Sequence, residues 1–476
     1  MELVTIIKIW DWLLHTIYIN NNINQKSKEM KKTILLTVVL ITLLFSCTEN
    51  KKSVQSAKQK PNTYQVKIDS LLKAYNKNDE FMGSIILTQN GKTVYENTVG
   101  FSDIKSKKKA NSDTKYRIGS VTKSFTATLI FKAIEENKLD INETIESYFP
   151  NVKNANKITI AHLLQHRSGI HSFTKDKWFF DNRTKQISST EMQSKISKYE
   201  SDFEPNSKGE YSNSNYFLLA LILEKNYDTS FDTLLQEKLC KPLKLENTYS
   251  GKEININDNE SYSYDYDEKW IEFPETDLST AKGTGSIVST TKNLNRFFEG
   301  LLTEKIISAE SLKSMKTIND GFGMGLFRYK IIDRQGFGHR GRIDEFRSTS
   351  IYFPKENLAF TLNSNGSKID INDVYTEILK LYFDDAPVEI SAGEVETFVG
   401  VYVSQNDASD KAVFVQNKNS LVHVIKNEFE ESLIYKGENR FVMEQMYGEA
   451  ISFTFSEDGK EMIFEQGGKT WKYLKQ

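Results

Sequence analysis

The chain is poor in the residues that build disulfides, kinks and basic surfaces. Its 476 residues include only two cysteines and seven prolines, so no disulfide framework is expected. Lys and Arg number 62 against 64 Asp and Glu, with no basic block after the leader, which gives no indication of nucleic-acid binding. No Gly-x-Ser-x-Gly sequence occurs, which argues against the α/β-hydrolase fold. The 38% hydrophobic and 12% aromatic content is enough for a large core and predicts two folded units.

The N-terminal region has the layout of a secretory leader. Met30-Lys31-Lys32 precedes an apolar run over residues 34–45, which is too short to span a bilayer comfortably. Leu44-Phe45-Ser46-Cys47 resembles the bacterial lipobox, in which the cysteine carries the lipid and becomes the mature N-terminus. We therefore expect residues 30–47 to be a lipoprotein signal peptide and Cys47 to be lipidated.

The residues on either side of this leader complete the expected N-terminal organisation. Residues 48–62 are polar, Lys-rich and without periodicity, which is typical of a flexible tether. Residues 1–29 are expected to be an extension upstream of the true start, although a longer membrane segment through residues 6–18 stays an alternative. The protein is thus placed in the bacterial cell envelope, bound to a membrane by its lipid and facing either the periplasm or the outer surface.

Ser120 is the strongest candidate nucleophile. Eight serines in the chain have a lysine three residues later, so the spacing alone has little weight. Ser120-Val121-Thr122-Lys123 stands out because a helix-period apolar run through Phe125 and Leu129 follows it directly. At a helix start, backbone N–H groups favour developing negative charge, and Lys123 one turn on can accept the hydroxyl proton.

Two further motifs supply groups that such a nucleophile needs. Tyr211-Ser212-Asn213 precedes an apolar helix; its phenol, with its pKa lowered by cations, could shuttle a proton, and its amide could bind a substrate carbonyl. His339-Arg340-Gly341 is the only His-x-Gly in the chain. A glycine on a strand edge lets a substrate approach closely, and the next N–H, at Arg342, can form an oxyanion hole with that of Ser120.

In this order the three motifs resemble those of the penicillin-recognising serine hydrolases. The similarity is to the class C β-lactamase-like branch, which also contains DD-peptidases, D-aminopeptidases and esterases, and it extends over residues 64 to 384. Further segments typical of that branch are His162–Ile170, Gly283–Thr290 and Phe322–Gly325. The resemblance implies an acyl-enzyme on Ser120, with Lys123 assisting its deprotonation and Tyr211 acting as general base and acid. It also implies that Asn213, His339, Gly341 and Arg342 bind substrate, and that no cofactor or metal takes part.

Two departures from that branch concern specificity. Lactamases of the branch commonly have lysine at the position of His339, so the chain is more similar to peptidase and esterase members. Arg342 replaces the usual small residue after the glycine, where it narrows the pocket or offers a guanidinium to a substrate carboxylate.

The expected fold is an α+β, β-lactamase/transpeptidase-like antiparallel sheet, flanked by helices and carrying an inserted helical lobe, over residues 63–385. Strand patterns early and late in this range, with helices between, suggest a sheet built from both ends. Residues 392–476 alternate in short strands and are expected to form a small all-β module resembling a lipocalin-like barrel.

Other interpretations stay open at this point. His162 and His166 have the i, i+4 spacing of zinc proteases, but no glutamate lies between them, so a metal site is disfavoured. The leading function is an envelope serine hydrolase of peptidoglycan-type D-amino-acid peptides, with an esterase or a weak β-lactamase as alternatives. A protein of another class, which binds or senses such ligands without turnover, is the third possibility.

Overall fold

The computed structural model describes residues 63–476, except for 333, 386–389, 426–428 and 444–450. The predicted signal peptide, lipidation site and tether therefore lie outside the described residues. Within the described part of the chain, no helix is long and apolar enough to cross a membrane.

The central element is a six-stranded antiparallel sheet assembled from both ends of its domain. Its strand order is β10-β11-β12-β13-β1-β2, so that β1 pairs with β13, from Phe81 opposite Ser367 to Gln89 opposite Leu358. The turn Asn90-Gly91 closes the β1–β2 hairpin with positive φ at both residues (50° and 73°), as a primed turn requires. The strands are β1 Phe81–Gln89, β2 Lys92–Val99, β10 Phe327–Ile331, β11 Arg334–Ile343, β12 Phe346–Phe353 and β13 Leu358–Ser367.

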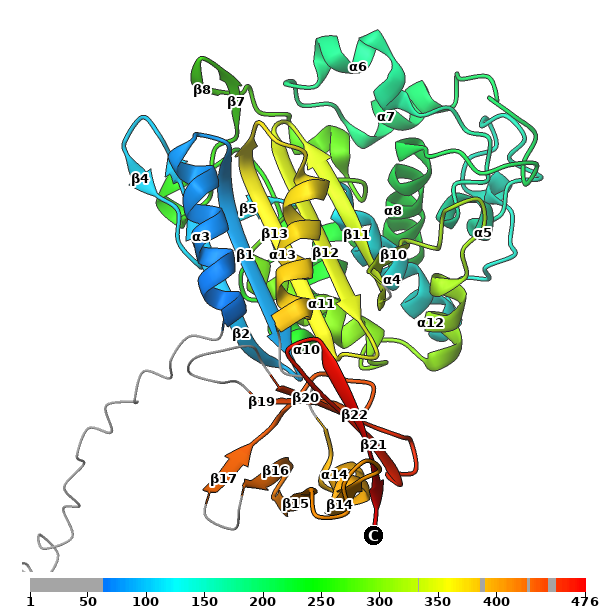
Figure 1. Cartoon of the computed structure of the whole chain (residues 1–476). Coiled ribbons are helices and arrows are strands. Elements are labelled where there is room, and N and C mark those ends of the chain that lie inside the picture. Colours follow the sequence, from blue (N-terminus) through cyan, green and yellow to red (C-terminus); the bar gives the residue numbers. More distant parts are fainter. Residues whose placement is uncertain (1–62, 333, 386–389, 426–428, 444–450) are drawn as a thin grey trace, which may run out of the picture. The chain divides into compact units, whose positions relative to one another are not determined.

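Both faces of this sheet are covered by helices. Helices α3 (Thr63–Lys77) and α13 (Ile371–Asp385) pack on one face, where they bury Ile351 and Phe353 of β12 (Figure 1). Tyr352 lies between these two residues in sequence and belongs to the core on the opposite face, where α11 (Thr291–Leu302) packs. Period-2 alternation thus divides the strand between two cores.

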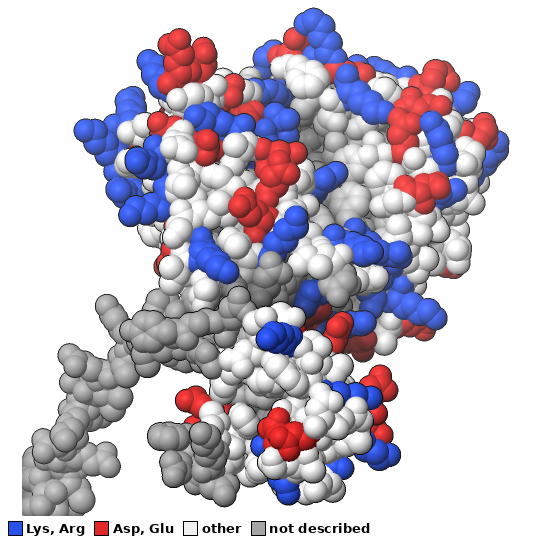
Figure 2. Space-filling view, viewed as in Figure 1, with Lys and Arg blue, Asp and Glu red and all other residues white. Residues whose placement is uncertain are grey.

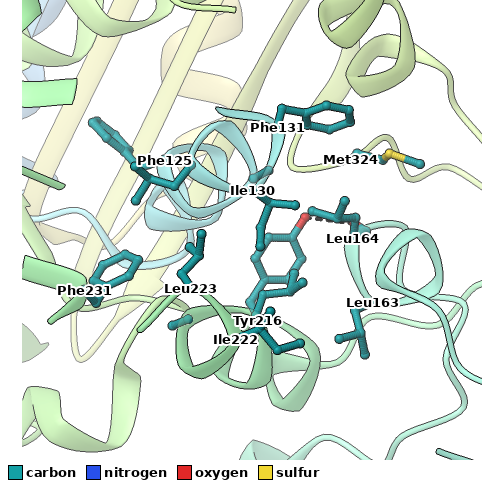
Figure 3. Close-up of a cluster of buried hydrophobic side chains, with 14 of the residues drawn as sticks. Phe125, Ile130, Phe131, Leu163, Leu164, Tyr216, Ile222, Leu223, Phe231 and Met324 are labelled. Atoms are coloured by element: carbon teal, nitrogen blue, oxygen red, sulfur yellow. Dashed lines mark hydrogen bonds between the residues drawn. The ribbon is translucent and has the colours of Figure 1, made fainter. Parts of the chain in front are cut away.

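Helix α4 (Thr122–Glu135) runs through the larger of these cores. Eleven of its fourteen residues are buried, which is typical of a helix surrounded by protein on all sides. It packs against α8 (Asn213–Tyr227), and between the two Tyr216 donates its hydroxyl to the carbonyl of Leu164 (2.8 Å; Figure 3). The packing therefore holds the starts of α4 and α8, which carry two of the three sequence motifs, in one core.

Residues 116–316 form the expected helical lobe, but with more strands than the sequence predicted. A three-stranded sheet joins segments distant in sequence, β5 (Tyr116–Arg117), β9 (Ile287–Ser289) and β6 (Tyr249–Ser250), and a hairpin is formed by β7 (Tyr264–Asp267) and β8 (Lys269–Glu272). The α-helices are α5 Ile160–Leu164, α6 Lys177–Asn182, α7 Ser189–Ile196, α8, α9 Phe231–Leu235, α10 Lys241–Leu243, α11 and α12 Ala309–Lys316. Strands of two to four residues are too short to leave a periodic pattern.

The C-terminal residues form a nearly closed, barrel-like sheet of nine antiparallel strands. Their order is β17-β16-β15-β14-β22-β21-β20-β19-β18, around a core that includes Tyr402, Phe414 and Phe455. The sequence missed the short helix α14 and strands β17, β18 and β19, and it began the first strand at Phe398, which is the last residue of α14. The elements are α14 Ala392–Phe398, β14 Gly400–Ser404, β15 Lys411–Asn417, β16 Ser420–Ile425, β17 Phe429–Ser432, β18 Ile434–Tyr435, β19 Arg440–Met443, β20 Ile451–Phe455, β21 Glu461–Gln466 and β22 Lys469–Lys475.

Candidate active site

Ser120 lies in a short 3₁₀ helix, Gly119–Val121, that leads directly into α4. It is the second residue of this helix, so its N–H has no helical carbonyl to bind and is available to a ligand oxygen. Gly119 has φ +52°, and a Cβ there would lie 2.8 Å from the backbone atoms of Arg342. Glycine is therefore needed at position 119 both for the turn and for the close approach of β11.

Lys123 lies one turn after Ser120 and is completely buried. Its Nζ is 3.0 Å from the Ser120 Oγ, 2.7 Å from the Asn213 Oδ1 and 2.8 Å from the Thr284 carbonyl oxygen. Burial lowers the pKa of Lys123 well below its ordinary value, because no carboxylate is present to compensate the charge. As an ammonium, the Nζ donates to all three oxygens, the Ser120 Oγ included. A neutral amine has two N–H donors, which the two carbonyl oxygens can occupy, and its lone pair can then accept the Ser120 hydroxyl proton.

Asn213, the first residue of α8, is held on both sides of its amide. The Oδ1 accepts from Lys123, and the Nδ2 donates to the Thr174 hydroxyl (2.8 Å). These partners fix which side of the amide is oxygen. The sequence predicted that this amide binds substrate; in the structure it also orients the amine beside Ser120.

Tyr211 lies beside the same pair of residues. Its ring centroid is 5.0 Å from the Lys123 Nζ and 4.4 Å from the His166 ring. We expected cationic neighbours to lower the pKa of the phenol, and this expectation is wrong in direction. Burial raises the pKa, and the hydrogen bond with Ser120 and the charge of Arg340 only partly offset it. The phenol is consequently neutral at physiological pH and able to donate a proton.

The β11 strand brings the third motif against the 3₁₀ turn. A Cβ on Gly341 would lie 2.0 Å from the Ile118 oxygen and 2.8 Å from the Ser120 nitrogen, so only glycine fits there. His339 is 2% exposed and its Nδ1 lies 2.7 Å from the carbonyl oxygen of Arg340, which makes that nitrogen a donor. Burial lowers the pKa of His339 to about 3, so the ring is neutral.

A cavity of about 490 Å³ opens beside Ser120. Asn213 and Arg342 line it, whereas Lys123, Tyr211, His339 and Gly341 are not among its lining residues. Aromatic and charged side chains both line it; the main contributors are Phe173, Phe179, Phe180, Phe273, Arg183, Arg342, Asp344 and Glu345. Phe180 is 62% exposed and Arg342 has 68% of its side chain exposed, so both stand at the rim.

Asp344, at the tip of the β11–β12 hairpin, is a site residue that the sequence did not indicate. Its carboxylate is fully buried and accepts from Arg183 (2.9 Å), from Arg117 (3.4 Å) and from the N–H and hydroxyl of Thr276 (3.1 and 2.6 Å). It therefore joins the strand before Ser120, the strand of Gly341 and a segment of the cavity wall. Only long-range contacts show this, because an isolated Asp in a turn has no distinguishing pattern.

We expect Asp344→Asn to destabilise the protein strongly. The amide would leave Arg117 and Arg183 without their anion and would place its own donors against the donors of Thr276. Breaking a buried ion pair from one side costs about 3–5 kcal/mol of the free energy of unfolding. Urea denaturation measures this loss.

Glu260→Gln is the matched control for that substitution. Glu260 is also buried and accepts from Tyr249 (2.7 Å) and from the Asn255 N–H (3.2 Å), but it does not line the cavity. We expect it to lower stability less, since it has no arginine partner in the described residues. Equal losses for both variants would contradict the assigned importance of Asp344.

The two histidines with zinc-protease spacing have other partners. The His162 Nδ1 accepts from the Thr159 N–H in a capping box, and the His166 Nδ1 accepts from the Ser212 N–H (3.2 Å). Within the residues that the structure describes, no group of three or more His, Cys, Asp or Glu could hold a metal ion.

Fold and site together define a serine hydrolase with a β-lactamase/transpeptidase fold. The beta-lactamase family model matches residues 68–379, about two thirds of the chain, and the chain belongs to this family. It is 25% identical over 447 residues to penicillin-binding protein 4* of Bacillus subtilis, covering 84% of this chain and 97% of that protein. It is 25% identical over 343 residues to the teichoic acid D-alanine hydrolase of Staphylococcus aureus, covering 70% and 83%. With the S. aureus protein flp it shares 27% identity over 325 residues, 64% of each chain.

Solved structures are similar in fold. The D-amino acid amidase of Ochrobactrum anthropi SV3 matches with a TM-score of 0.60 and 22% identity, covering 67% of this chain and 98% of that one. The octameric penicillin-binding protein homologue of Pyrococcus abyssi matches with a TM-score of 0.59 and 19% identity, covering 86% and 99%. At this level of identity the structural likeness shows the fold alone. The predicted family, fold class and serine-hydrolase class are confirmed.

Proposed function

We propose that the protein cleaves amide or peptide bonds next to a D-amino acid through an acyl-enzyme on Ser120, with Lys123, Tyr211, Asn213 and β11 as its machinery. The observation that supports this most is the environment of Lys123. Its Nζ lies within hydrogen-bond distance of two carbonyl oxygens and of the Ser120 Oγ, and burial disfavours its charge, so the neutral amine can keep its N–H donors on the carbonyl oxygens and offer its lone pair to the Ser120 hydroxyl.

The acylation step follows from these positions. Lys123 takes the proton of the Ser120 hydroxyl while the Oγ bonds to the substrate carbonyl carbon, and the oxyanion that forms accepts from the N–H groups of Ser120 and Arg342. Collapse of this intermediate breaks the carbon–nitrogen bond. The leaving amine takes the Tyr211 proton, and the Lys123 ammonium returns a proton to the phenol. Tyr211 is thus assigned as an acid first, in keeping with its raised pKa.

Deacylation uses the same groups in reverse. Water attacks the Ser120 ester and gives its proton to Lys123, and the serine oxygen leaves with a proton from Tyr211 or Lys123. Asn213 holds the lysine amine in place in both steps and presents the edge of its amide to the cavity. His339, which is buried and neutral, supports the strand against which the substrate backbone lies.

The substrate class is proposed from two lines of support. Two similar proteins, a teichoic acid D-alanine hydrolase and a D-amino acid amidase, are named for D-amino acids, and a third is named a penicillin-binding protein. The cavity of about 490 Å³ offers an aromatic wall for a side chain and charged groups for a terminus. We propose peptidoglycan-type D-amino-acid peptides as the leading substrates; an esterase or weak β-lactamase is the second candidate.

A substrate panel tests this proposal. The products to be measured are p-nitroaniline from D-alanine p-nitroanilide and its L-enantiomer, D-alanine from a D-Ala-D-Ala peptide, p-nitrophenol from p-nitrophenyl acetate, and the ring-opened form of nitrocefin. We expect kcat/KM for the D-amides to exceed that for the L-anilide by at least about tenfold. Turnover of the ester alone would favour an esterase, and turnover of nitrocefin alone a β-lactamase. Saturable binding of the D-peptide without turnover would favour the binding protein.

Arg342→Ala should weaken binding of substrates with a free carboxylate more than binding of neutral esters. The guanidinium stands exposed at the cavity rim, and it shares its ion-pair partner Glu345 with Arg347. Loss of one charge-assisted hydrogen bond corresponds to about 1.5–3 kcal/mol, or a tenfold or larger rise in KM. KM for a D-Ala-D-Ala peptide and for p-nitrophenyl acetate should be compared, with Arg347→Ala as the control. Equal changes for both substrates would contradict the proposed role.

We propose that the hydrolase, residues 63–385, and the barrel-like module, residues 392–476, are held at the cell envelope by a lipid on Cys47. The support is the sequence of residues 30–47 and the names of envelope-associated relatives. Mass spectrometry of the N-terminal peptide of membrane-bound protein tests it. A mature N-terminus other than lipidated Cys47 would remove the anchor from the proposal.

A further inference from the structure

A second cavity, of about 500 Å³, lies between the edge strand β10 and helix α13. It shares no lining residue with the cavity beside Ser120. Four of its ten lining residues are cationic and none is acidic; the ten are Phe327, Arg328, Tyr329, Lys330, Ile331, Ile332, Arg340, Tyr375, Thr376 and Lys380. In a chain with a net charge of −2, this is a local concentration of positive charge and does not reflect a basic surface overall.

These four cations are not compensated by neighbouring carboxylates. Among the described residues, none of the four makes an ion pair within 4.0 Å. Arg340 donates to the Asn372 Oδ1 at 3.5 Å. Glu377, on the same helix as Lys380, instead accepts from Tyr75 of α3 (2.6 Å). Figure 2 shows Lys and Arg side chains on this face of the molecule, with Asp and Glu side chains beside them.

A buried hydroxyl without a partner lies in the wall of this cavity. Tyr329 is 9% exposed, and within the described part of the chain its OH finds no hydrogen-bond partner. Its ring meets that of Tyr375 edge-on at 6.3 Å, so the hydroxyl cannot turn away freely. Buried hydroxyls in folded proteins almost always have a hydrogen-bond partner. Because this hydroxyl has almost no accessible surface, a ligand oxygen reaches it only when the ring shifts toward the cavity.

Taken together, the groups around this cavity can donate hydrogen bonds and carry positive charge, and they lack an anion. Two guanidinium groups, two ammonium groups and a phenol match a ligand with several acceptor oxygens and more than one negative charge. A single carboxylate would neutralise one charge of four, whereas a phosphate offers up to two charges and several oxygens for bidentate contacts with arginine. We propose that the cavity between β10 and α13 is a binding site for phosphate groups, separate from the site of hydrolysis.

Two sources could present this phosphate: a soluble phosphate compound or the headgroup of an anionic phospholipid. The purified full-length chain in detergent should be titrated with inorganic pyrophosphate by calorimetry, and its flotation with phosphatidylglycerol vesicles compared with that on phosphatidylcholine. Because lipidation would itself carry the chain to vesicles, the readout is the difference between the two compositions. Pyrophosphate binding supports a soluble ligand. Preference for phosphatidylglycerol with no pyrophosphate binding supports a headgroup.

Substitutions of residues that line the cavity test whether the phosphate compound or headgroup binds there. Arg328→Gln with Lys380→Gln removes two exposed charges, and we expect it to weaken binding about tenfold or more, since each charge makes a charge-assisted contact with the ligand. Tyr329→Phe keeps the ring and removes only the hydroxyl, and it should weaken binding less. Lys411→Gln with Lys469→Gln, two exposed lysines of the barrel-like module, is the matched control and should bind as the wild type does. No binding in either assay, or equal binding by all variants, would overturn the proposal.

Activity measurements keep this inference separate from the proposed function. The variants of the phosphate site leave Ser120 and its partners unchanged, so the rate of amide hydrolysis and the affinity for phosphate can be measured separately in each variant. Loss of phosphate binding with intact turnover supports two independent sites. Absence of turnover in the wild type would contradict the proposed function and leave the phosphate titration valid.

Discussion

Ser120→Ala is expected to abolish covalent labelling and to reduce amide hydrolysis by about 10⁴-fold or more, as loss of a catalytic nucleophile does in other serine hydrolases. Alanine removes the Oγ that lies 3.0 Å from the Lys123 Nζ and leaves the 3₁₀ turn intact. A time course of intact mass with benzylpenicillin measures the adduct. A stable adduct in the wild type would point to a peptidase-like site, and its rapid loss to β-lactamase turnover.

Ser70→Ala is a matched control because Ser70 also has a lysine three residues later on a helix. Its hydroxyl is exposed and donates to the Val66 carbonyl (2.8 Å), so labelling and hydrolysis should be unchanged. An adduct of undiminished yield in Ser120→Ala would show that another residue is the nucleophile. No adduct in the wild type, with amide or ester turnover that still needs Ser120, would mean that penicillin is not accepted.

Lys123→Arg is expected to slow acylation about 10²- to 10⁴-fold, the usual contribution of a general base. A guanidinium stays protonated and cannot take the Ser120 proton, although it keeps donors for Asn213 and Thr284. Burst-phase kinetics measure the acylation rate directly. The control is Lys132→Arg. Lys132 lies on the same helix, and its Nζ donates to the Ile306 carbonyl (3.3 Å). An acylation rate within about threefold of the wild type would contradict a base role for Lys123.

The pH dependence of acylation also tests whether Lys123 is the general base. Burial lowers the pKa of Lys123, so the neutral form that accepts the proton is populated at lower pH than for an ordinary lysine. Acylation should rise with pH through this lowered pKa and then level off. A rate that continues to rise through the ordinary lysine range, near about pH 10.4, would indicate an unperturbed amine.

The sequence predicted those elements whose pattern is local. The β1–β2 hairpin follows from Asn90-Gly91 between two strand patterns, and the start of α11 follows from Thr290, whose hydroxyl accepts from the Asn293 N–H (3.2 Å). Helix α3 and the end-to-end assembly of the sheet were also predicted correctly.

Strand β11 was not predicted over its full length, although its motif was found. Its glycines at 336, 338 and 341 interrupt any alternation of apolar residues, and they are there because other atoms occupy the space of a Cβ. At Gly338, for example, a Cβ would lie 1.9 Å from the Ser350 oxygen on β12. Conversely, the sequence pattern predicts a strand from Gly323 to Ile332. The observed strand, β10, begins only at Phe327, because the backbone at Gly325 adopts φ +76°. Both differences come from contacts between strands that a local pattern does not contain.

By itself, the sequence determined which residues could react: a serine at a helix start with a lysine one turn on, a Tyr-x-Asn and a single His-x-Gly. Helical periodicity places Ser120 and Lys123 on one face whatever the rest of the chain does. Only the tertiary structure decided the protonation states and hydrogen-bond partners of these residues. Asn213 and Thr284, 90 and 161 residues beyond Lys123, take up its donors, and burial by distant segments lowers its pKa and raises that of Tyr211. Protonation and hydrogen-bond direction depend on solvent exclusion and on partners brought together by folding, and these are properties of the packed core, not of any local run of residues.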